Sequence, residues 1–197
     1  MSAVLVLASA SPRRRQLLTE AGIACEVVPS QVAEVQRPGE SPEAFARRAA
    51  REKAADVVRS RPLACVLAAD TVVVVDGLVF GKPVDRGDAR RMLATLSGRT
   101  HRVLTAVTLI TPTGGEEVAV ESEVAFREIT FGEIEAYLDS GEPFDKAGAY
   151  GVQGRARAFV RHVHGSHSNV VGLPLEAVVP MLERHLRRAA AVRSTTG

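Results

Sequence analysis

The chain has 197 residues, 46% of them hydrophobic, which is enough to bury one sizeable core in a single domain or a closely joined pair. Its 25 basic and 23 acidic residues give a net charge of +2, which does not favour a general polyanion-binding protein. Cys25 and Cys65 are too few for a disulfide framework and lack metal-ligand spacing, as is usual in a reducing compartment.

The N-terminal apolar run is short and precedes its basic residues, so it is not predicted to be a signal peptide. No stretch approaches the ~18 apolar residues that a membrane-spanning helix needs. We therefore expect a soluble, cytoplasmic protein without a membrane partner.

Predicted strands and helices alternate along the first half of the chain. The longest predicted helix begins after Ser41, which suits the N-cap position, with Pro42 at the first helical position. The dipeptide Asp76-Gly77 predicts a hairpin turn. The expected elements are, in order, a strand at 4–7, a helix at 12–21, a strand at 25–29, the long helix from 42, strands at 65–69 and 72–75 separated by Asp70-Thr71, a strand at 78–80 and a helix at 88–96.

The second half is expected to be rich in strands. Its predicted elements are strands at 102–111 and 117–127, a helix near 131–138, strands near 158–163 and 169–171, and a closing helix from about Pro174. Pro180 should kink that helix or mark its true start, and the tail at 190–197 is expected to fray. Helices interleaved with strands and hairpins predict an α/β fold, a mixed sheet flanked by helices, in a single domain at 1–189.

Three arginines, Arg13, Arg14 and Arg15, stand at the start of the first predicted helix. Cations are unfavourable there, because a helix N-terminus already carries about half a positive charge. A bound phosphate would compensate, since free backbone N–H groups and arginine side chains both suit an anion. A solvated helix face is the open alternative. On the phosphate interpretation, removing Arg14 should not lower the stability of the ligand-free protein.

Two acids are candidate catalytic groups. Asp70 is expected at the end of an apolar strand, where ligand crevices form in α/β proteins, although an Asp there can simply begin a turn. Glu34 lies in a loop between Val32 and Val35, where a solvated side chain is the alternative.

Two lysines are candidate phosphate contacts. Lys53 continues the apolar stripe of its helix with Phe45 and Ala49, so it either extends its ammonium to solvent or meets an anion. Lys82 lies between a glycine and a proline in GKPVD, where a stiff backbone suits a phosphate contact and a solvated lysine is the alternative.

The segment DKAGAYGVQG places Gly148, Gly151 and Gly154 three residues apart, which is neither a P-loop nor a dinucleotide fingerprint. Glycines at this spacing would permit close approach of a ligand to the backbone. Tyr150 would then offer stacking to a nucleobase, and Gln153 an amide for its edge.

Three histidines, His162, His164 and His167, have a spacing that can bind zinc. No carboxylate or cysteine lies nearby in the sequence, so an exposed sheet edge is the favoured interpretation. His101 is interpreted as a hydrogen-bonded polar residue at the entrance to a strand.

The candidate residues suit a phosphate-rich substrate. The sequence has no serine-nucleophile elbow and no sign of an activated cysteine, which disfavours covalent catalysis. Several cations, two acids and a loop with an amide indicate instead a divalent metal, with water as the nucleophile.

Seven motifs follow one another along residues 3–182: LASASPRRRQLL, REKA, AADTVV, GKPVD, LSGRTH, DKAGAYGVQG and NVVGLPL. In this order and spacing they resemble the Maf family of septum-formation-like nucleoside triphosphate pyrophosphatases. The resemblance implies hydrolysis of a nucleoside triphosphate to the monophosphate and diphosphate, with Mg or Mn. It also implies a fold similar to that of the inosine triphosphatase group, an elongated mixed sheet with two lobes around a central cleft, and a homodimer as an expected assembly.

The resemblance implies roles residue by residue. Asp70 matches the proposed general base, and Glu34 matches an acidic position tied to metal or catalysis, so both are expected metal ligands. The other expected site residues are Lys53 and Lys82 as catalytic triphosphate contacts, Ser9 and Arg14 as further triphosphate contacts, and Arg13, Thr71 and Gln153 as substrate-binding positions tied to base choice.

Two local features refine the resemblance. The form AGAYGVQG resembles the branch that acts on dTTP and UTP, rather than the branch acting on 7-methyl-GTP or CTP. Ala33 replaces an acid that often precedes Glu34 in relatives, which would weaken metal binding if that acid is a ligand.

The alternative from another class is a non-catalytic nucleotide or nucleic-acid binding protein acting in cell-division arrest. Two tyrosines, no tryptophan and a near-neutral charge form a poor stacking platform for single strands. We therefore expect no stable nucleic-acid partner, and a nucleoside triphosphate, standard or modified, as the substrate.

Overall fold

The computed structural model describes the backbone of residues 4–194 and the side chains of residues 4–185. The chain forms two compact units, each assembled from separate stretches of sequence. Unit 1 comprises Met1–Asp70, Ala106–Ala119 and Gly172–Gly197, and unit 2 comprises Thr71–Thr105 and Val120–Val171.

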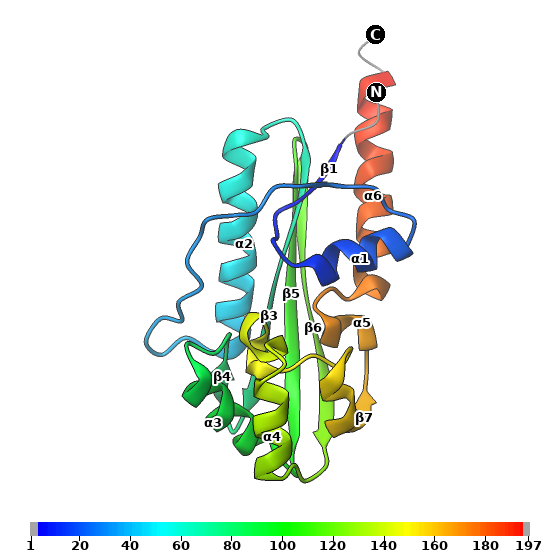
Figure 1. The fold of residues 1–197 in the computed structure, drawn as a ribbon. Coiled ribbons are helices and arrows are strands. Elements are labelled where there is room, and N and C mark those ends of the chain that lie inside the picture. The colour runs from blue at the N-terminus through cyan, green and yellow to red at the C-terminus, as the bar shows by residue number, and fades with distance from the viewer. Residues whose placement is uncertain (1–3, 195–197) are drawn as a thin grey trace. The chain divides into compact units, whose positions relative to one another are not determined.

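The strands form a seven-stranded sheet in the order β2-β1-β3-β5-β6-β7, with β4 paired to β3 (Figure 1). The strands are β1 Leu5–Leu7, β2 Glu26–Val27, β3 Cys65–Val75, β4 Leu78–Phe80, β5 Thr100–Thr111, β6 Gly114–Phe126 and β7 Val160–His164. β1 pairs in parallel with β2 and β3, whereas the β3–β4 and β6–β7 pairs are antiparallel. The sheet is therefore mixed, which confirms the expected α/β class.

The helices fall between the strands in the chain. They are α1 Pro12–Glu20, α2 Pro42–Ser60, α3 Arg86–Leu96, α4 Phe131–Leu138, α5 His167–Val171 and α6 Leu175–Ser194, with short 3₁₀ turns η1 Glu142–Asp145, η2 Ala147–Ala149 and η3 Arg155–Phe159. Within unit 1, β1 runs between α2 and α6 (Figure 1). No helix in the part of the chain that the structure describes is long and apolar enough to span a membrane.

In unit 1, one face of β1 and β3 packs against α2. The buried cluster comprises Val6, Ala8, Val66 and Ala68 from the strands and their ends, and Ala54 and Val57 from α2. The parallel register sets Val6 opposite Val66, so the two strands present matching side chains to the helix. Because side chains alternate along a strand, Asp70 lies on the same face of β3 as Val66 and Ala68.

Local signals in the sequence correctly placed several element boundaries. The Ser41 hydroxyl accepts a hydrogen bond from the Ala44 N–H at 3.2 Å, so α2 begins at the predicted N-cap. Asp76 and Gly77 both have positive φ, at 51° and 77°, as a tight hairpin between β3 and β4 requires.

Two expectations about elements were wrong. β3 runs without a break from Cys65 to Val75, so Asp70 lies within a strand and not at its end. Residues 169–171 belong to the short helix α5 and not to a strand, and the Ser166 hydroxyl accepts from the Asn169 N–H near its start. Of the two alternatives for Pro180, the structure shows the proline inside α6, which begins at Leu175, next to the expected start at Pro174. Of the tail that was expected to fray, residues 195–197 lie outside the described residues.

Candidate functional site

Asp70 faces α2 because of its register in β3. Val66, Ala68 and Asp70 share one face of the strand, and the first two pack against α2. On the helix, Lys53 directly precedes Ala54, a member of the same buried cluster. The apolar packing of strand against helix therefore brings a carboxylate and an ammonium together in the interior.

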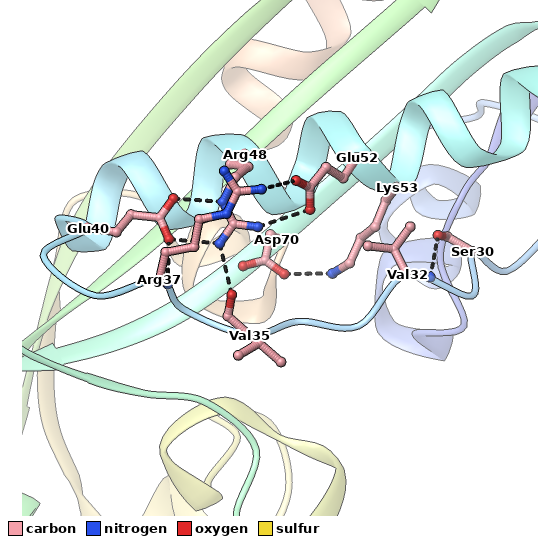
Figure 2. A network of polar contacts seen from close by, with 9 residues as sticks. All are labelled: Ser30, Val32, Val35, Arg37, Glu40, Arg48, Glu52, Lys53 and Asp70. Carbon is pink, nitrogen blue, oxygen red and sulfur yellow. Dashed lines mark hydrogen bonds and ion pairs between the residues drawn. The ribbon is translucent and has the colours of Figure 1, made fainter.

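Lys53 holds two carboxylates at once. Its Nζ lies 2.6 Å from Asp70 Oδ1 and 2.7 Å from Glu34 Oε1. The Lys53 and Asp70 side chains are only 8% and 3% exposed, whereas Glu34 is 37% exposed. Figure 2 shows Asp70 and Lys53 pointing toward one another. Lys53 therefore meets anions rather than solvent, and the structure brings all three predicted residues to one place.

The electrostatic balance at Asp70 suits a base. Burial raises the pKa of Asp70, and the nearby Glu34 charge raises it further. Lys53 and Arg14 oppose this rise, because a cation favours the ionised carboxylate. A buried carboxylate with a raised pKa binds a proton more strongly than an ordinary aspartate, which general base chemistry requires.

Arg14 and Ser9 contact each other near the start of α1. Arg14 Nη1 donates to Ser9 Oγ at 3.1 Å, and the Ser11 N–H donates to the same hydroxyl at 3.2 Å. Burial lowers the pKa of Arg14, while the charges of Asp70 and Glu34 raise it. Arg14 therefore lies close enough to interact electrostatically with the Asp70 and Glu34 carboxylates. The neighbouring cation Arg13 lowers the pKa of Arg14 further.

Arg14 also has a structural contact that the sequence did not reveal. Its Nε donates to the Gly172 backbone carbonyl at 2.7 Å, which ties α1 to the segment before α6. This charged hydrogen bond compensates part of the cost of placing arginines at a helix start. It also changes the expectation that Arg14 is dispensable for stability.

Replacement Arg14→Ala should therefore lower the stability of the ligand-free protein by roughly 1–3 kcal/mol, since a charged donor to a backbone carbonyl is lost. Thermal and denaturant unfolding would measure this loss. The matched control is Arg15→Ala, because Arg15 is an exposed neighbour on the same helix. Equal stability of the two variants would show that the Gly172 contact contributes nothing and would restore the original expectation.

Thr71, the next residue of β3, belongs to unit 2 and is part of a hydroxyl network. The Thr105 hydroxyl donates to the Asn169 backbone carbonyl at 3.0 Å. A hydroxyl has one proton, so in the 2.9 Å contact between the two threonine hydroxyls Thr71 is the donor. Any further partner of the Thr71 hydroxyl must therefore donate to it.

Lys82 and Gln153 also belong to unit 2, and their loops are connected. The Gly148 N–H donates to the Gly81 carbonyl at 3.0 Å, which joins the DKAG segment to the loop that carries Lys82. Lys82 and Gln153 are both exposed. The structure thus places these two predicted residues on adjoining loops of unit 2.

Residues 4–185 match the family described as Maf-like protein. The chain belongs to the Maf family. A "dTTP/UTP pyrophosphatase" of Anaeromyxobacter dehalogenans is 51% identical, with 93% of this chain and 95% of the relative covered. One of that name from Methylococcus capsulatus is 50% identical, with 92% and 90% covered. A "nucleoside triphosphate pyrophosphatase" of Xylella fastidiosa is 48% identical, with 91% and 97% covered.

In this Maf-family chain, the conformation and packing of the protein itself account for Gly148 and Gly154. Gly148 has a φ of 66°, and a Cβ there would lie 2.8 Å from a Val73 methyl group. Gly154 has a φ of 94°, and a Cβ there would lie 2.9 Å from the Glu142 carboxylate. Both glycines therefore serve backbone conformation and internal packing, whereas their expected close approach to a ligand stays a prediction.

Tyr150 does not present its ring to a ligand. The ring is buried, its hydroxyl lies 2.6 Å from His101 Nε2, and it packs edge-on against Phe126. Burial lowers the pKa of His101 to about 4, so the imidazole is neutral. The expected stacking role of Tyr150 was wrong, whereas the interpretation of His101 as a hydrogen-bonded polar residue is confirmed.

The three histidines near β7 lie on two elements, His162 and His164 on β7 and His167 at the start of α5. His162 and His164 lie on β7, the last strand in the sheet order, and are exposed. Among residues 4–185, no group of three or more His, Cys, Asp and Glu side chains is arranged to hold a metal ion. The sheet-edge interpretation is confirmed.

The Maf resemblance implies a divalent metal, and the acids of unit 1 have the chemistry to hold one. Glu34 and Asp70 both contact the Lys53 ammonium, so the two carboxylates already face a common cation. Mg²⁺ is commonly bound by only one or two carboxylates, with water and substrate phosphates completing its ligands. A pair of acids, without the third at position 33, is consistent with that mode of binding.

Sequence reasoning missed the residues that support the site. Arg48 and Asp56 of α2 hold the loop that carries Glu34. Arg48 and Glu52 lie four residues apart on a predicted helix, and this spacing indicates an ion pair from the sequence alone. The partners Glu40 and Asn169 gave no such signal, because their contacts depend on the fold.

Proposed function

We propose that the protein is a nucleoside triphosphate pyrophosphatase that hydrolyses dTTP and UTP to the monophosphate and diphosphate. The observation that carries the proposal is the buried Asp70 carboxylate, held together with Glu34 on the ammonium of Lys53 in a Maf-family chain. The names of relatives 48–51% identical over most of the chain support both the reaction and the substrates.

In the proposed reaction, Asp70 accepts a proton from water as the water attacks the α-phosphorus. The bond between the α- and β-phosphates breaks, and diphosphate leaves. The raised pKa of Asp70 supports this role, because a base is most effective when its pKa approaches the working pH. Lys53 would keep the carboxylate ionised and correctly oriented before attack.

The cations and the helix start of unit 1 would bind the triphosphate. Arg14 and Ser9 lie together at the start of α1, where backbone N–H groups and the helix dipole favour an anion. We assign Lys82 to the same triphosphate. These groups would stabilise charge that develops on the leaving diphosphate.

We propose Mg²⁺ or Mn²⁺ as the cofactor, with Glu34 and Asp70 as its protein ligands. When bound, the ion would neutralise negative charge on the phosphates and the leaving group. Phosphate oxygens and water would supply the remaining ligands.

Arg13, Thr71 and Gln153 are proposed to determine which base is accepted. Uracil and thymine present an N3–H donor between two carbonyl oxygens, whereas N3 of cytosine is an acceptor. The Thr71 hydroxyl acts as an acceptor toward partners beyond Thr105, which suits the N3–H group and opposes cytosine. The exposed Gln153 amide can donate to a carbonyl oxygen of the base.

The direct test is diphosphate release from dTTP, UTP, CTP and GTP and from modified triphosphates, with Mg²⁺ and with Mn²⁺. We expect dTTP and UTP to be the preferred substrates. Diphosphate release from none of them would favour the non-catalytic binding protein. A preference for CTP or GTP would keep the reaction and overturn the assignment to the dTTP/UTP branch.

Gln153→Ala should reduce kcat/KM for dTTP and UTP by roughly tenfold to a hundredfold, because a polar group of the base would lose its hydrogen-bond partner. Residual activity on CTP and GTP should fall much less. Parallel kinetics on the four triphosphates would measure the difference. An equal loss on all four would show that Gln153 supports the shape of the loop and reads no base.

The assembly and location of the enzyme are also proposed. A homodimer is proposed from the family resemblance, and a cytoplasmic location from the nature of the substrate and from a cysteine content, Cys25 and Cys65, too low for a disulfide framework. Sedimentation of the purified chain would test the dimer.

A further inference from the structure

The loop that carries Glu34 is fastened to α2 on both sides of that residue. Residues 28–41, between β2 and α2, form neither helix nor strand. On the N-terminal side, Asp56 Oδ2 accepts from the Ser30 hydroxyl and the Gln31 N–H, both at 3.0 Å. On the C-terminal side, Arg48 Nη2 donates to the Val35 carbonyl at 2.8 Å. The position of Glu34 therefore depends on two residues of α2.

Arg48 is the centre of the C-terminal fastening (Figure 2). Its Nε and Nη2 each lie 2.7 Å from an oxygen of the Glu40 carboxylate, which makes the pair bidentate. Its Nη1 donates to Glu52 Oε2 at 3.0 Å, one turn further along α2. The guanidinium also lies over the buried Phe45 ring, 5.5 Å from its centre. A planar group with this many partners has one orientation available to it.

This network differs from an ordinary surface ion pair. The side chains of Arg48 and Glu40 are only 15% and 11% exposed. Arg48 lowers the pKa of Glu40 to about 2, so the pair stays charged across the working pH range. The neighbouring Arg47–Glu43 pair is 33% and 55% exposed and joins two residues of the same helix. The Arg48 network, in contrast, contacts the backbone of the loop at Val35, the residue after Glu34.

We propose that Arg48 is a positioning residue that clamps residues 28–41 onto α2 and so sets Glu34 against Lys53 and Asp70. Arg48 contacts Glu40, Glu52, the Phe45 ring and the Val35 carbonyl, and none of these is a proposed catalytic group. Its effect passes through the Val35 carbonyl to Glu34, whose Oε1 lies 2.7 Å from Lys53 Nζ. α2 carries both Arg48 and Lys53, so one rigid helix determines the distance between the clamp and the cation. The role in catalysis rests on the proposed function, whereas the clamp itself does not.

The test is a double-mutant cycle of Arg48→Met and Glu34→Gln, assayed on dTTP. Methionine keeps an apolar stem near Phe45 and removes the fork. Arg48→Met should lower kcat/KM about tenfold to a hundredfold, as loss of a supporting contact around an active group commonly does. In the Glu34→Gln background it should have little further effect, because its route to the chemistry is already lost. Arg48→Lys should fail to restore activity, since an ammonium cannot reproduce the bidentate pair.

Arg47→Met is the matched control, because Arg47 is the adjacent arginine of α2 and its ion pair lies at the surface. Its activity should stay within about twofold of the parent. Equal multiplicative losses from Arg48→Met in both backgrounds would overturn the proposal, as they would show general destabilisation. A loss in Arg48→Met with none in Glu34→Gln would also overturn it, because the effect could not pass through Glu34.

Hydrogen exchange provides a readout that does not depend on activity. The Arg37 N–H donates to Glu40 Oε2 at 3.0 Å, so release of the clamp should accelerate exchange at this amide in Arg48→Met. Unchanged exchange across residues 34–37 would overturn the clamp. If the parent hydrolysed no triphosphate but exchange accelerated as expected, the proposed function would fail while the clamp stood.

Discussion

Replacement Asp70→Asn is expected to lower kcat on dTTP by at least about 10²-fold, because an amide cannot accept the proton of the attacking water. The amide keeps the shape of the carboxylate, and its oxygen can still accept from Lys53, which lies 2.6 Å from Asp70 Oδ1. Glu34 continues to neutralise Lys53. Single-turnover hydrolysis would measure the loss, and binding of a dTTP analogue with a non-hydrolysable α–β bridge should change little.

The dependence of kcat/KM on pH tests the same assignment of Asp70 as the base. The base acts only when ionised, so kcat/KM of the parent should fall as the pH falls through the pKa of Asp70. Burial raises that pKa above the ordinary value of 3.8, so the fall should begin at a higher pH than for an exposed aspartate. In Asp70→Asn this limb should disappear from whatever activity remains.

Asp76→Asn is the control for Asp70→Asn. Asp76 lies in the turn after the same strand, and its positive φ of 51° is one that asparagine also adopts. Activity of Asp76→Asn should match the parent. If Asp70→Asn also stayed within a few-fold of the parent, Asp70 would not be the base and Glu34 would become the candidate.

Replacement Lys53→Met is expected to cause a loss of similar size at neutral pH, about 10²-fold or more, because it removes a cation that contacts both carboxylates. The charge of Lys53 and its hydrogen bond lower the pKa of Asp70, so their removal should raise that pKa further. The acid limb of kcat/KM should therefore move to higher pH, and part of the activity should return as the pH is raised.

The stability of Lys53→Met should depend on pH in the opposite direction to its activity, with a smaller loss of stability at lower pH. Breaking a buried ion pair costs about 3–5 kcal/mol when a charge is left without its partner. Because the folded-state pKa of Asp70 lies above the unfolded value, the folded protein binds the proton more tightly. The cost should then shrink as the pH falls from above the folded-state pKa toward about 3.9. Thermal unfolding across this range would measure it.

Arg51→Met is the control for Lys53→Met. Arg51 also lies on α2, and its ion pair with Glu117 is at the surface, so its loss should move neither the acid limb nor the unfolding temperature appreciably. An acid limb of Lys53→Met that stayed in place or moved to lower pH would show that Lys53 does not govern the ionisation of Asp70.

Contiguous residues alone were enough to predict the helix starts and the turns. Ser41 and Pro42 predict the start of α2, and Asp76-Gly77 predicts the hairpin, because a cap or a turn needs only a few neighbouring residues. The α/β class follows in the same way from alternating local patterns. The short run at 169–171 misled the prediction, since a few apolar residues suit a strand and a buried helical turn equally well.

The sequence and its resemblance to the Maf family also indicated which residues belong to the candidate site, but not which of them are in contact. Asp70 was placed at a strand end, whereas the register of β1 against β3 buries it within a strand and aims it at α2. The Lys53–Asp70 bond joins residues 17 apart, and the Arg14–Gly172 bond joins residues 158 apart. Such pairs form only after strands and helices have packed. Their geometry comes from the burial of apolar faces far along the chain, which no local pattern contains.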